Sequence, residues 1–264
     1  MKAPRFAYAR PASVAEALAL LDRHKDDARV LAGGQSLVPM LNFRVAAPKV
    51  LVDINRIAAL SGIKVTKSQV RIGALVRHVE LERSPEIAKH LPLVAAAVPH
   101  IAHPAIRNRG TFGGSCALAD PAAELPACAL ALGATFVIAG KKSERRVAAE
   151  EFFKGLYATA LKPGELLVAA EFPLAKAGER SAFGELARRH GDYAMVGVAV
   201  HGSKKLRAAF FGVGDRPEVV EAESAEGILS KVAELEPRAD LHASAATKLH
   251  LAKVLARRVL AQLS

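Results

Sequence analysis

The sequence predicts a mixed fold of the α+β class. Apolar runs of strand length alternate with stretches of helical periodicity along the chain, and two Gly-Gly pairs interrupt this pattern. With 264 residues, of which 51% are hydrophobic, the chain is long enough to bury one large core or two moderate ones. We divide it into three segments, residues 1–55, 56–175 and 176–264.

The first segment is expected to contain one helix and two short strands. Ser13 and Glu16 have the spacing of a capping box, and the apolar residues after Ser13 recur on one helical face. Strands are expected at 29–32, just before the first Gly-Gly pair, and at 49–54 in "KVLVDI". Together these elements form a small unit.

The second and third segments mix strands with helices. In residues 56–175, strands are expected at 70–74, 134–139 and 166–172 and helices at 91–98 and 124–133. The polar stretch "AKAGERSA" (175–182) is typical of a linker or long turn. Beyond it, three strand-like runs (182–189, 194–201 and 205–211) precede two helical runs. The basic run "KKSERR" (141–146) lies between apolar runs, and we expect it to be a solvated hairpin turn.

Composition argues against several classes of protein. The net charge of +11 raises nucleic acid as a partner, but the chain has three Tyr and no Trp, and no stretch interleaves basic with aromatic residues. An anionic cofactor or an acidic protein surface explains the charge better. Cys116 and Cys128 form neither a CxxC pair nor a metal-ligand cluster, which argues against a metal site. With no secretory signal or apolar membrane span in the sequence, we expect a cytoplasmic protein.

Two short segments with paired glycines carry the candidate chemistry. The first glycine segment, residues 32–37, connects a strand-like run to a helical one, and the second glycine segment, residues 111–115 ("TFGGS"), is expected to repeat this arrangement. Glycine permits positive φ and close approach of a ligand to backbone N–H groups, which attract anions where a helix begins. Two such segments suit a pyrophosphate, although each can also be a simple tight turn. Neither matches GxGxxG or GxxxxGK(S/T), which argues against a nicotinamide Rossmann fold and a Walker-type triphosphatase.

Two longer stretches carry a family resemblance. "AGGQSLVPMLNFR" (32–44) and "IAHPAIRNRGTFGGSCALADPAAELPA" (101–127) closely resemble the flavin-binding signatures of the FAD-binding medium subunit of molybdenum hydroxylases, such as aerobic carbon monoxide dehydrogenase and xanthine dehydrogenase. The resemblance continues through "LARRHGDYAMVGVAV" (186–200) and "DLHASAATKLHLAKVLARRVL" (240–260). It implies a two-part FAD-binding domain of the vanillyl-alcohol-oxidase type (1–55 and 56–175) and a smaller C-terminal α+β domain (176–264).

The resemblance also implies which residues contact FAD. The two glycine segments would hold the pyrophosphate from opposite sides, with Ile101 near the flavin. Asp120 resembles the aspartate directed toward the ribose and adenine, with a helix cap as the alternative. Leu166 or Leu167 would lie beside the cofactor or in the core, and Tyr193 would lie against the isoalloxazine or at a domain interface. The expected cofactor-binding residues are Ala32, Gly33, Gly34, Gln35, Ser36, Leu37, Ile101, Thr111, Gly113, Gly114, Ser115, Asp120, Leu166, Leu167 and Tyr193.

The sequence departs from the family pattern at several positions. Many relatives have histidine where Gln35 stands, and Gln35 can donate and accept hydrogen bonds but cannot titrate. Relatives often have lysine in the region of Glu185, which puts a cationic flavin contact there in doubt. Cys116 lies beside the second glycine segment and is interpreted as a packed residue. His100 and His103 are expected to be structural or surface residues, with a place facing the flavin as the alternative.

The implied function is electron transfer, with no catalytic residue or metal ligand in this chain. A molybdenum-binding large subunit would oxidise the substrate, and electrons would pass through two 2Fe–2S clusters of a small subunit to this FAD and then to an external acceptor. The expected assembly is a dimer of such heterotrimers. Two alternatives stay open: a self-sufficient flavoprotein reductase of the same fold, and a flavin-free assembly subunit.

Overall fold

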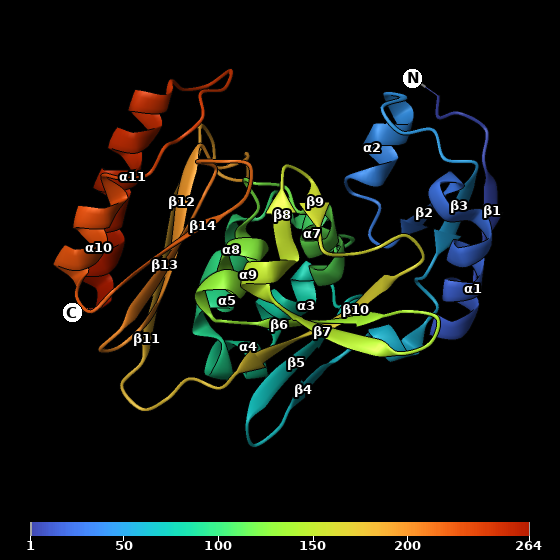
Figure 1. Ribbon diagram of the computed structural model, residues 1–264, viewed down its shortest axis with the longest axis horizontal. Helices are drawn as coiled ribbons and strands as arrows, with labels where there is room; N and C mark the ends of the chain where they lie inside the picture. The colour runs from blue at the N-terminus through green and yellow to red at the C-terminus, as the bar shows by residue number, and fades with distance from the viewer. Residues whose placement is uncertain (1, 264) are drawn as a thin grey trace.

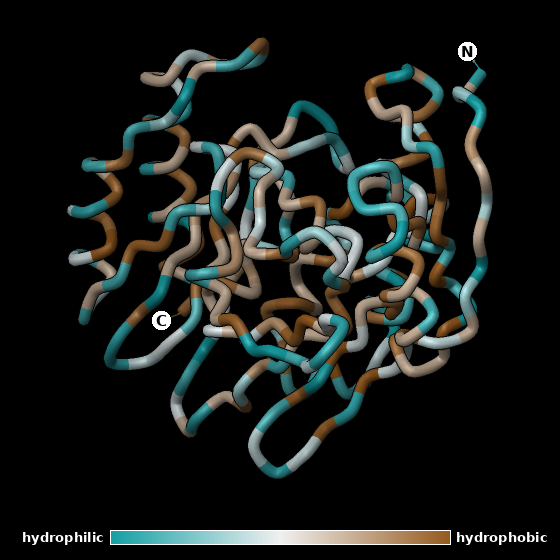
Figure 2. The backbone as a smooth tube through the Cα atoms, turned by 45° about the vertical axis from the view of Figure 1, so that its right-hand side comes forward, coloured by the Kyte–Doolittle hydropathy of each residue, from teal (hydrophilic) through white to brown (hydrophobic). Residues whose placement is uncertain are grey.

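The computed structural model describes residues 2–263 and contains three main β-sheets arranged along the long axis of the molecule (Figure 1). A three-stranded sheet lies at one end, a five-stranded sheet in the middle and a four-stranded sheet at the other end. In Figure 2 the hydrophobic stretches gather in the interior, while most projecting loops are hydrophilic. Among residues 2–263, no helix combines the length and apolar character needed to cross a bilayer.

The N-terminal lobe is a small parallel sheet with two helices. Its strand order is β1–β3–β2, and both pairings are parallel. The Ser13 side chain accepts a hydrogen bond from the Glu16 backbone N–H, which confirms the predicted start of the first helix. The elements are β1 (Ala7–Ala9), α1 (Val14–His24), η1 (Lys25–Asp27), β2 (Ala28–Leu31), α2 (Leu37–Asn42) and β3 (Val50–Asp53).

The middle unit is an antiparallel sheet in the order β4–β5–β10–β6–β7, with helices packed on one face. A separate two-stranded hairpin, β8–β9, lies beside α7 (Figure 1). The elements are η2 (Ala58–Leu60), β4 (Ile63–Val65), β5 (Gln69–Gly73), α3 (His78–Arg83), α4 (Pro85–His90), α5 (Pro92–Ala97), η3 (Val98–His100), α6 (Pro104–Arg107), α7 (Phe112–Leu118), α8 (Glu124–Ala131), β6 (Thr135–Ala139), β7 (Glu144–Ala148), α9 (Ala149–Phe152), β8 (Phe153–Gly155), β9 (Ala158–Thr159) and β10 (Leu166–Pro173).

The C-terminal unit is an antiparallel sheet between two helical layers. Its strand order follows the sequence, and one face is covered by α10 and α11 while the other packs on α5 and α8 of the middle unit (Figure 1). The elements are β11 (Arg180–Leu186), β12 (Val196–Gly202), β13 (Leu206–Phe211), β14 (Glu218–Ala222), α10 (Ala225–Val232), α11 (Ala245–Leu260) and η4 (Ala261–Leu263).

Alternating residues of the central strands join these units. Leu166 in β10 belongs to a core shared with the N-terminal lobe, whereas Leu167 belongs to the core beneath the helices of the middle unit. In β12, Val198 packs toward α10 and α11, and Ala199 faces the middle unit. Because successive strand residues point to opposite faces, β10 and β12 each contribute to the cores on both sides of their sheets.

Most predicted helices and strands are present, and the missed elements are short. The strands β1, β4, β8, β9 and β14 have two to five residues each, so they show little periodicity in the sequence. The hairpin turn predicted at 141–146 is wrong in part. Arg145 and Arg146 belong to β7. Arg145 donates to Glu165, just before β10, at 2.8 Å, and Arg146 donates to Glu171, in β10, at 3.0 Å. These ion pairs hold both arginines in the sheet rather than in a solvated turn.

Candidate functional site

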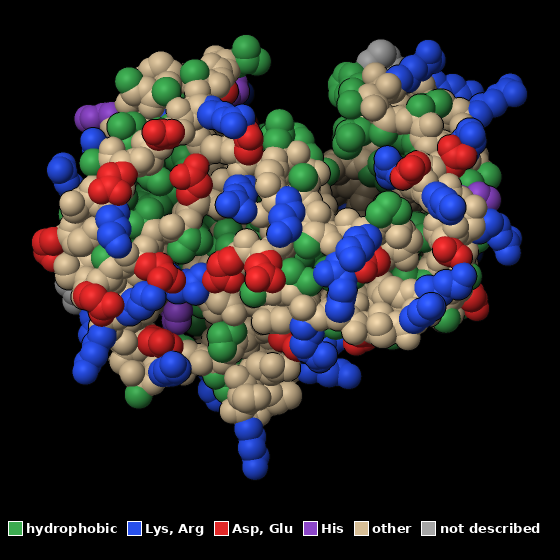
Figure 3. All heavy atoms as spheres, viewed as in Figure 1, with side chains coloured by type: hydrophobic (Ala, Val, Ile, Leu, Met, Phe, Trp, Pro, Cys, Tyr) green, Lys and Arg blue, Asp and Glu red, His purple; other side chains and the backbone are tan. Residues whose placement is uncertain are grey.

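The two glycine segments lie side by side although they are far apart in the sequence. A Cβ atom on Gly33 would lie 2.4 Å from the Arg109 carbonyl oxygen and 2.9 Å from Gly110 Cα, so only glycine permits this approach. The surface is hollowed between the N-terminal lobe, which carries the first segment, and the middle unit, which carries the second (Figure 3). The structure thus brings together the two segments expected to share one ligand.

The first glycine segment is open. Residues 33–36 are half-buried between β2 and α2, and none of their backbone N–H groups donates a hydrogen bond to an acceptor within residues 2–263. Gly34 has a φ of 75°, as expected for a glycine turn, and the Gln35 amide donates weakly to the Gly33 carbonyl oxygen at 3.4 Å. Since half-buried N–H groups require an acceptor, this row of four is suited to an anionic ligand.

The second glycine segment is closed, and the expected repeat of the first arrangement is wrong. Phe112 N–H donates to the Val76 carbonyl and Gly113 N–H donates to the Ala74 carbonyl, both at 2.9 Å. Thr111 caps helix α7, because its hydroxyl oxygen accepts from Gly114 N–H at 3.1 Å. These N–H groups are therefore already used by the protein.

Close packing explains the glycines of the second segment. A Cβ atom on Gly113 would lie 2.5 Å from Ala74 Cβ, and one on Gly114 would lie 2.7 Å from the Thr111 hydroxyl oxygen. Neither glycine has a positive φ. Gly114 is exposed and Ser115 is half-buried, so these two residues present the accessible part of the segment.

Ile101 and Tyr193, both expected near the flavin, come from two loops that touch. Gly191 has a φ of 85°, and a Cβ atom there would lie 2.7 Å from the Ala102 carbonyl oxygen. Ala102 itself has a φ of 45°. Ile101 is buried, whereas the Tyr193 side chain is 70% exposed and available to a ligand.

Asp120 serves a turn and also faces two tyrosines. One carboxylate oxygen accepts from Ala122 N–H at 2.9 Å, and the other accepts from the Tyr157 hydroxyl at 3.3 Å. The N-cap position of helix α8 is Ala123, so Asp120 closes the preceding turn and the helix-cap alternative is wrong. Partial desolvation against the protein surface, followed by the Asp120 carboxylate, raises the pKa of the two exposed tyrosines, Tyr157 and Tyr193.

Leu166 and Leu167 lie on opposite faces of β10 and are both only 4% exposed. Each packs among protein side chains, as the core alternative expects. Cys116 is fully buried, and burial raises the pKa of its thiol, in keeping with a packed residue. A contact of either leucine with a cofactor stays a prediction.

A buried acidic cluster joins the C-terminal unit to the middle unit. One Glu185 oxygen lies 3.4 Å from His100 Nδ1, and the other has no hydrogen-bond partner among the described residues. Burial, followed by the nearby carboxylates of Glu185 and Asp120, raises the pKa of Glu124 to about 8. The Glu185 side chain is therefore a buried partner of a histidine.

Sequence reasoning missed four polar residues around the glycine segments: Asn55, Arg77, His78 and Arg107. Arg107 is buried, pairs with Glu82 at 2.9 Å and donates to the Ile101 carbonyl at 3.1 Å, so it holds the loop that carries Ile101. The only signal in the sequence is that polar residues follow apolar runs, as Asn55 follows "VLVDI".

His78 lies beneath the start of the second segment. A Cβ atom on Gly110 would lie 2.9 Å from the His78 ring, and neither ring nitrogen has a hydrogen-bond partner among residues 2–263. Burial, only partly opposed by the neighbouring Thr111 backbone, lowers the pKa of His78 to about 4. The ring is therefore neutral at physiological pH.

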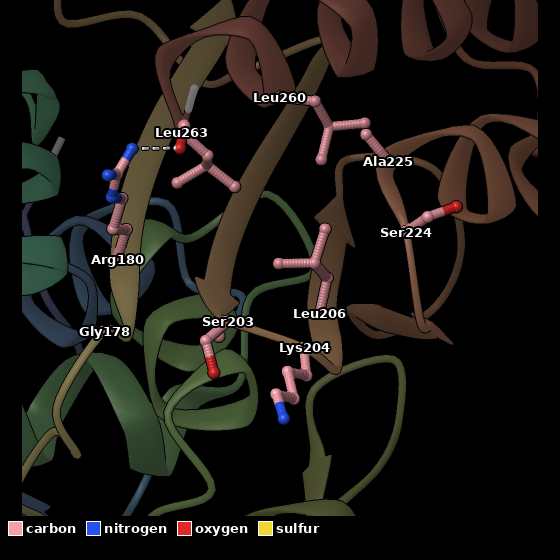
Figure 4. Close-up of a pocket in the computed structure, with 10 residues that line it drawn as sticks. Gly178, Arg180, Ser203, Lys204, Leu206, Ser224, Ala225, Leu260 and Leu263 are labelled. Carbon is pink, nitrogen blue, oxygen red and sulfur yellow. Dashed lines mark hydrogen bonds between the residues drawn. The ribbon is translucent and has the colours of Figure 1, made fainter.

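Two further cavities lie away from the glycine segments. One, of about 420 Å³, is in the C-terminal unit, where Arg180 donates to the Leu263 carbonyl at 2.6 Å and Lys204 and Ser224 lie at the rim (Figure 4). The other, of about 820 Å³, lies between the β8 region and residues 214–219. Neither is lined by a residue expected to contact FAD.

Residues 4–175 match the family described as the FAD binding domain in molybdopterin dehydrogenase. The chain belongs to this family. It is 39% identical over 282 residues to the 6-hydroxypseudooxynicotine dehydrogenase complex subunit alpha of Paenarthrobacter nicotinovorans, covering 99% of this chain and 95% of that protein. It is 45% identical over 197 residues to the carbon monoxide dehydrogenase medium chain of Hydrogenophaga pseudoflava, covering 75% of this chain and 69% of that one.

A solved structure extends the family match to the C-terminal unit. Carbon monoxide dehydrogenase from Hydrogenophaga pseudoflava, in a form that lacks the Mo-pyranopterin moiety of its molybdenum cofactor, superposes with a TM-score of 0.93 at 38% identity, covering 99% of this chain and 98% of that one. The predicted fold class and family are confirmed. As a family member, the chain is an FAD-binding oxidoreductase subunit of the molybdenum hydroxylase medium-chain type.

The described residues fit FAD. Four N–H groups of the first glycine segment have no acceptor within residues 2–263, and they match the acceptor oxygens of a pyrophosphate. The absence of a side chain at Gly33 keeps this turn against residues 109–110. The exposed Tyr193 ring beside the Ile101 loop offers an aromatic surface of the kind that stacks on a flavin.

Proposed function

We propose that the chain is the electron-transfer subunit of a molybdenum hydroxylase. Its partners would be a molybdenum-binding large subunit and a small subunit with 2Fe–2S clusters, assembled as a dimer of heterotrimers in the cytoplasm. The observation that carries the proposal is the similarity along 99% of the chain to a subunit of a dehydrogenase complex, which includes the C-terminal unit as well as the FAD-binding part.

We assign the FAD contacts as follows. Backbone N–H groups of residues 33–36 bind the pyrophosphate, and Gly114 with Ser115 contact it from the second segment. Asp120 accepts from the ribose end, as its two-oxygen carboxylate beside Tyr157 permits. Tyr193 lies against the flavin and limits its contact with water.

FAD supplies the redox chemistry, since a flavin exchanges electrons with both one-electron and two-electron partners. The residues of the chain bind the cofactor, fix its orientation and limit its contact with water. We divide the chain into three units, residues 1–55, 56–175 and 176–264. The first two, which form the FAD-binding part, would each contact one side of the cofactor, and the C-terminal unit would contact it through Tyr193. The basic surface, with a net charge of +11, favours association with acidic partner surfaces.

Reconstitution from three separately purified subunits tests the proposal. The isolated chain should carry FAD that is released intact by acid, yet oxidise no aromatic heterocycle, aldehyde or carbon monoxide. With both partner subunits present, substrate should bleach the oxidised-flavin absorbance, and omission of the iron–sulfur subunit should abolish this bleaching. Turnover by this chain alone with a nicotinamide would instead favour a self-sufficient reductase. A colourless chain that still assembles would favour an assembly subunit.

A further inference from the structure

The side chains of Asn55 and Arg77 bridge the two glycine segments. The Asn55 amide nitrogen donates to the Ala32 carbonyl at 2.8 Å, while the Asn55 amide oxygen accepts from the Arg77 guanidinium at 2.6 Å. The same guanidinium donates to the Arg109 carbonyl oxygen. Ala32 opens the first glycine segment and Arg109 precedes the second. Asn55 follows β3 of the N-terminal lobe and Arg77 precedes α3 of the middle unit, so the bridge joins two units of the chain.

The chemistry of the bridge permits only one orientation of Asn55. Arg77 has only donors, so the amide oxygen must face it, and the amide nitrogen must then face acceptors. It faces the Ala32 carbonyl, the Asp53 carboxylate at 2.5 Å and, more weakly, the Leu31 carbonyl at 3.5 Å. Asp53 also accepts from Asn55 N–H at 2.9 Å and from the Tyr8 hydroxyl, which fixes the far end of the network.

This bridge determines where the first N–H of the open segment points. The Ala32 carbonyl and the Gly33 N–H belong to one planar trans peptide, so they point in opposite directions. Holding the carbonyl on Asn55 directs the Gly33 N–H away from the bridge, and no acceptor within residues 2–263 takes it. The Arg77 contact with Arg109 simultaneously keeps the backbone next to Gly33 in place.

We propose that Asn55 and Arg77 are positioning residues for FAD, which lock the two glycine segments together and leave the Gly33 N–H free for the cofactor pyrophosphate. The inference rests on the proposed assignment of residues 33–36 to that pyrophosphate. Neither residue is placed in contact with FAD. Their contribution is to orient the peptide groups before the cofactor arrives, which reduces the entropy lost on binding.

Titration of the full-length apoprotein with FAD tests the bridge, with the melting temperature of each apoprotein measured in parallel. Asn55→Ala and Arg77→Met should weaken FAD binding by about tenfold to hundredfold, the loss associated with one or two charge-assisted hydrogen bonds. Arg71→Met is the matched control, because Arg71 pairs with Glu171 at 2.7 Å elsewhere on the middle sheet. It should leave FAD affinity unchanged even if it lowers the melting temperature.

Two conservative variants test whether Asn55 and Arg77 affect FAD affinity by positioning the backbone, rather than through their charge or through overall stability. Asn55→Asp retains an acceptor for Arg77 but cannot donate to the Ala32 carbonyl, so it should bind FAD as weakly as Asn55→Ala. Arg77→Lys keeps the positive charge but cannot reach both Asn55 and Arg109 with one planar group, so it should not restore affinity.

Three outcomes would overturn the proposal: wild-type affinity in Asn55→Ala and Arg77→Met, full rescue by Asn55→Asp or Arg77→Lys, or an equal loss in Arg71→Met. Gly33→Val in the same titration distinguishes the two levels of inference. If Gly33→Val retains FAD, the assigned pyrophosphate site is wrong, and the proposed role of Asn55 and Arg77 is wrong as well. If it loses FAD while the bridge variants do not, only the bridge is wrong.

Discussion

The two glycine segments look alike in the sequence and serve different purposes in the structure. In the first, the N–H groups of residues 33–36 have no acceptor among residues 2–263, and the Asn55 side chain holds the turn from outside. In the second, the N–H groups of residues 112–114 are bonded to residues 74–76 and to Thr111, and a buried glycine packs against Ala74. The comparison shows that one Gly-Gly pair leaves its backbone N–H groups open, while the other allows a helix to start close to a strand.

The most damaging change to the open segment should be Gly33→Val. Its Cβ would lie 2.4 Å from the Arg109 carbonyl oxygen, so the two segments must separate. We expect a loss of FAD affinity of at least about 100-fold, equivalent to two or more lost hydrogen bonds. The flavin content of the purified protein and an FAD titration measure it. The reason is this steric contact, because Gly33, unlike Gly34, does not have a positive φ.

Gly140→Val is the control for this substitution. Gly140 lies in the β6–β7 turn, and the nearest atom to a Cβ there is at an ordinary contact distance of 3.4 Å. This variant should retain its flavin. Normal flavin content in Gly33→Val would refute the assignment of the first segment.

The open segment was more predictable from the sequence than the closed one. A strand, a glycine pair and a helix that follow one another are local features, and local propensities were enough to expect a turn between a strand and a helix at residues 32–37. The partners of Phe112 and Gly113 lie at Val76 and Ala74, remote in sequence, so no local pattern could reveal that these N–H groups are used.

The bridge and the acidic cluster were unpredictable for the same reason. Asn55 and Arg77 meet only because the N-terminal lobe packs beside the middle unit. In the sequence, Glu185 looks like an ordinary strand residue. Its side chain is buried beside His100 only because β11 packs against the helices of the middle unit. Polar contacts between distant elements depend on the tertiary structure, whereas caps such as Ser13 depend on neighbours in sequence.

Lowering the pH should destabilise the packing around the closed segment before it affects the open one, because the buried His78 ring lies under the closed segment. The folded protein holds this ring neutral with a pKa of about 4, whereas the unfolded chain takes up a proton near pH 6.5. The His78 contribution to stability is therefore present above pH 6.5 and is lost as the pH falls from 6.5 to 4. The total loss is about 3 kcal/mol, at ~1.4 kcal/mol per pH unit.

Urea unfolding of the wild type and of His78→Leu between pH 4 and pH 7 measures this effect. The difference in the free energy of unfolding between the two proteins should shift in favour of the variant as the pH falls. His242→Leu is the control, since His242 lies in an exposed turn of the C-terminal unit. A difference that stays constant across this range would contradict the prediction.

Packing in the closed segment is tested by Gly113→Ala. The added methyl would lie 2.5 Å from Ala74 Cβ and 2.8 Å from the Ala74 carbonyl oxygen, so helix α7 must move off the β5 end. Overpacking of this kind costs about 1–3 kcal/mol. In contrast to Gly33→Val, the loss should appear in the unfolding of the apoprotein, without FAD. An apoprotein as stable as the wild type would contradict this packing role.

The smallest expected effect is that of the helix cap in the closed segment. Thr111→Val keeps the shape of the side chain but removes the hydroxyl oxygen that accepts from Gly114 N–H at 3.1 Å. Loss of an N-cap costs about 1 kcal/mol, so the apoprotein should be destabilised by roughly this amount. Thr111→Ser retains the oxygen and should restore stability.

The Gly114 N–H freed in Thr111→Val also becomes a donor without an acceptor, as in the open segment. If the second segment contacts the pyrophosphate there, FAD should stabilise Thr111→Val by at least as much as it stabilises the wild type. A smaller stabilisation by FAD would show that the Thr111 hydroxyl itself binds the cofactor.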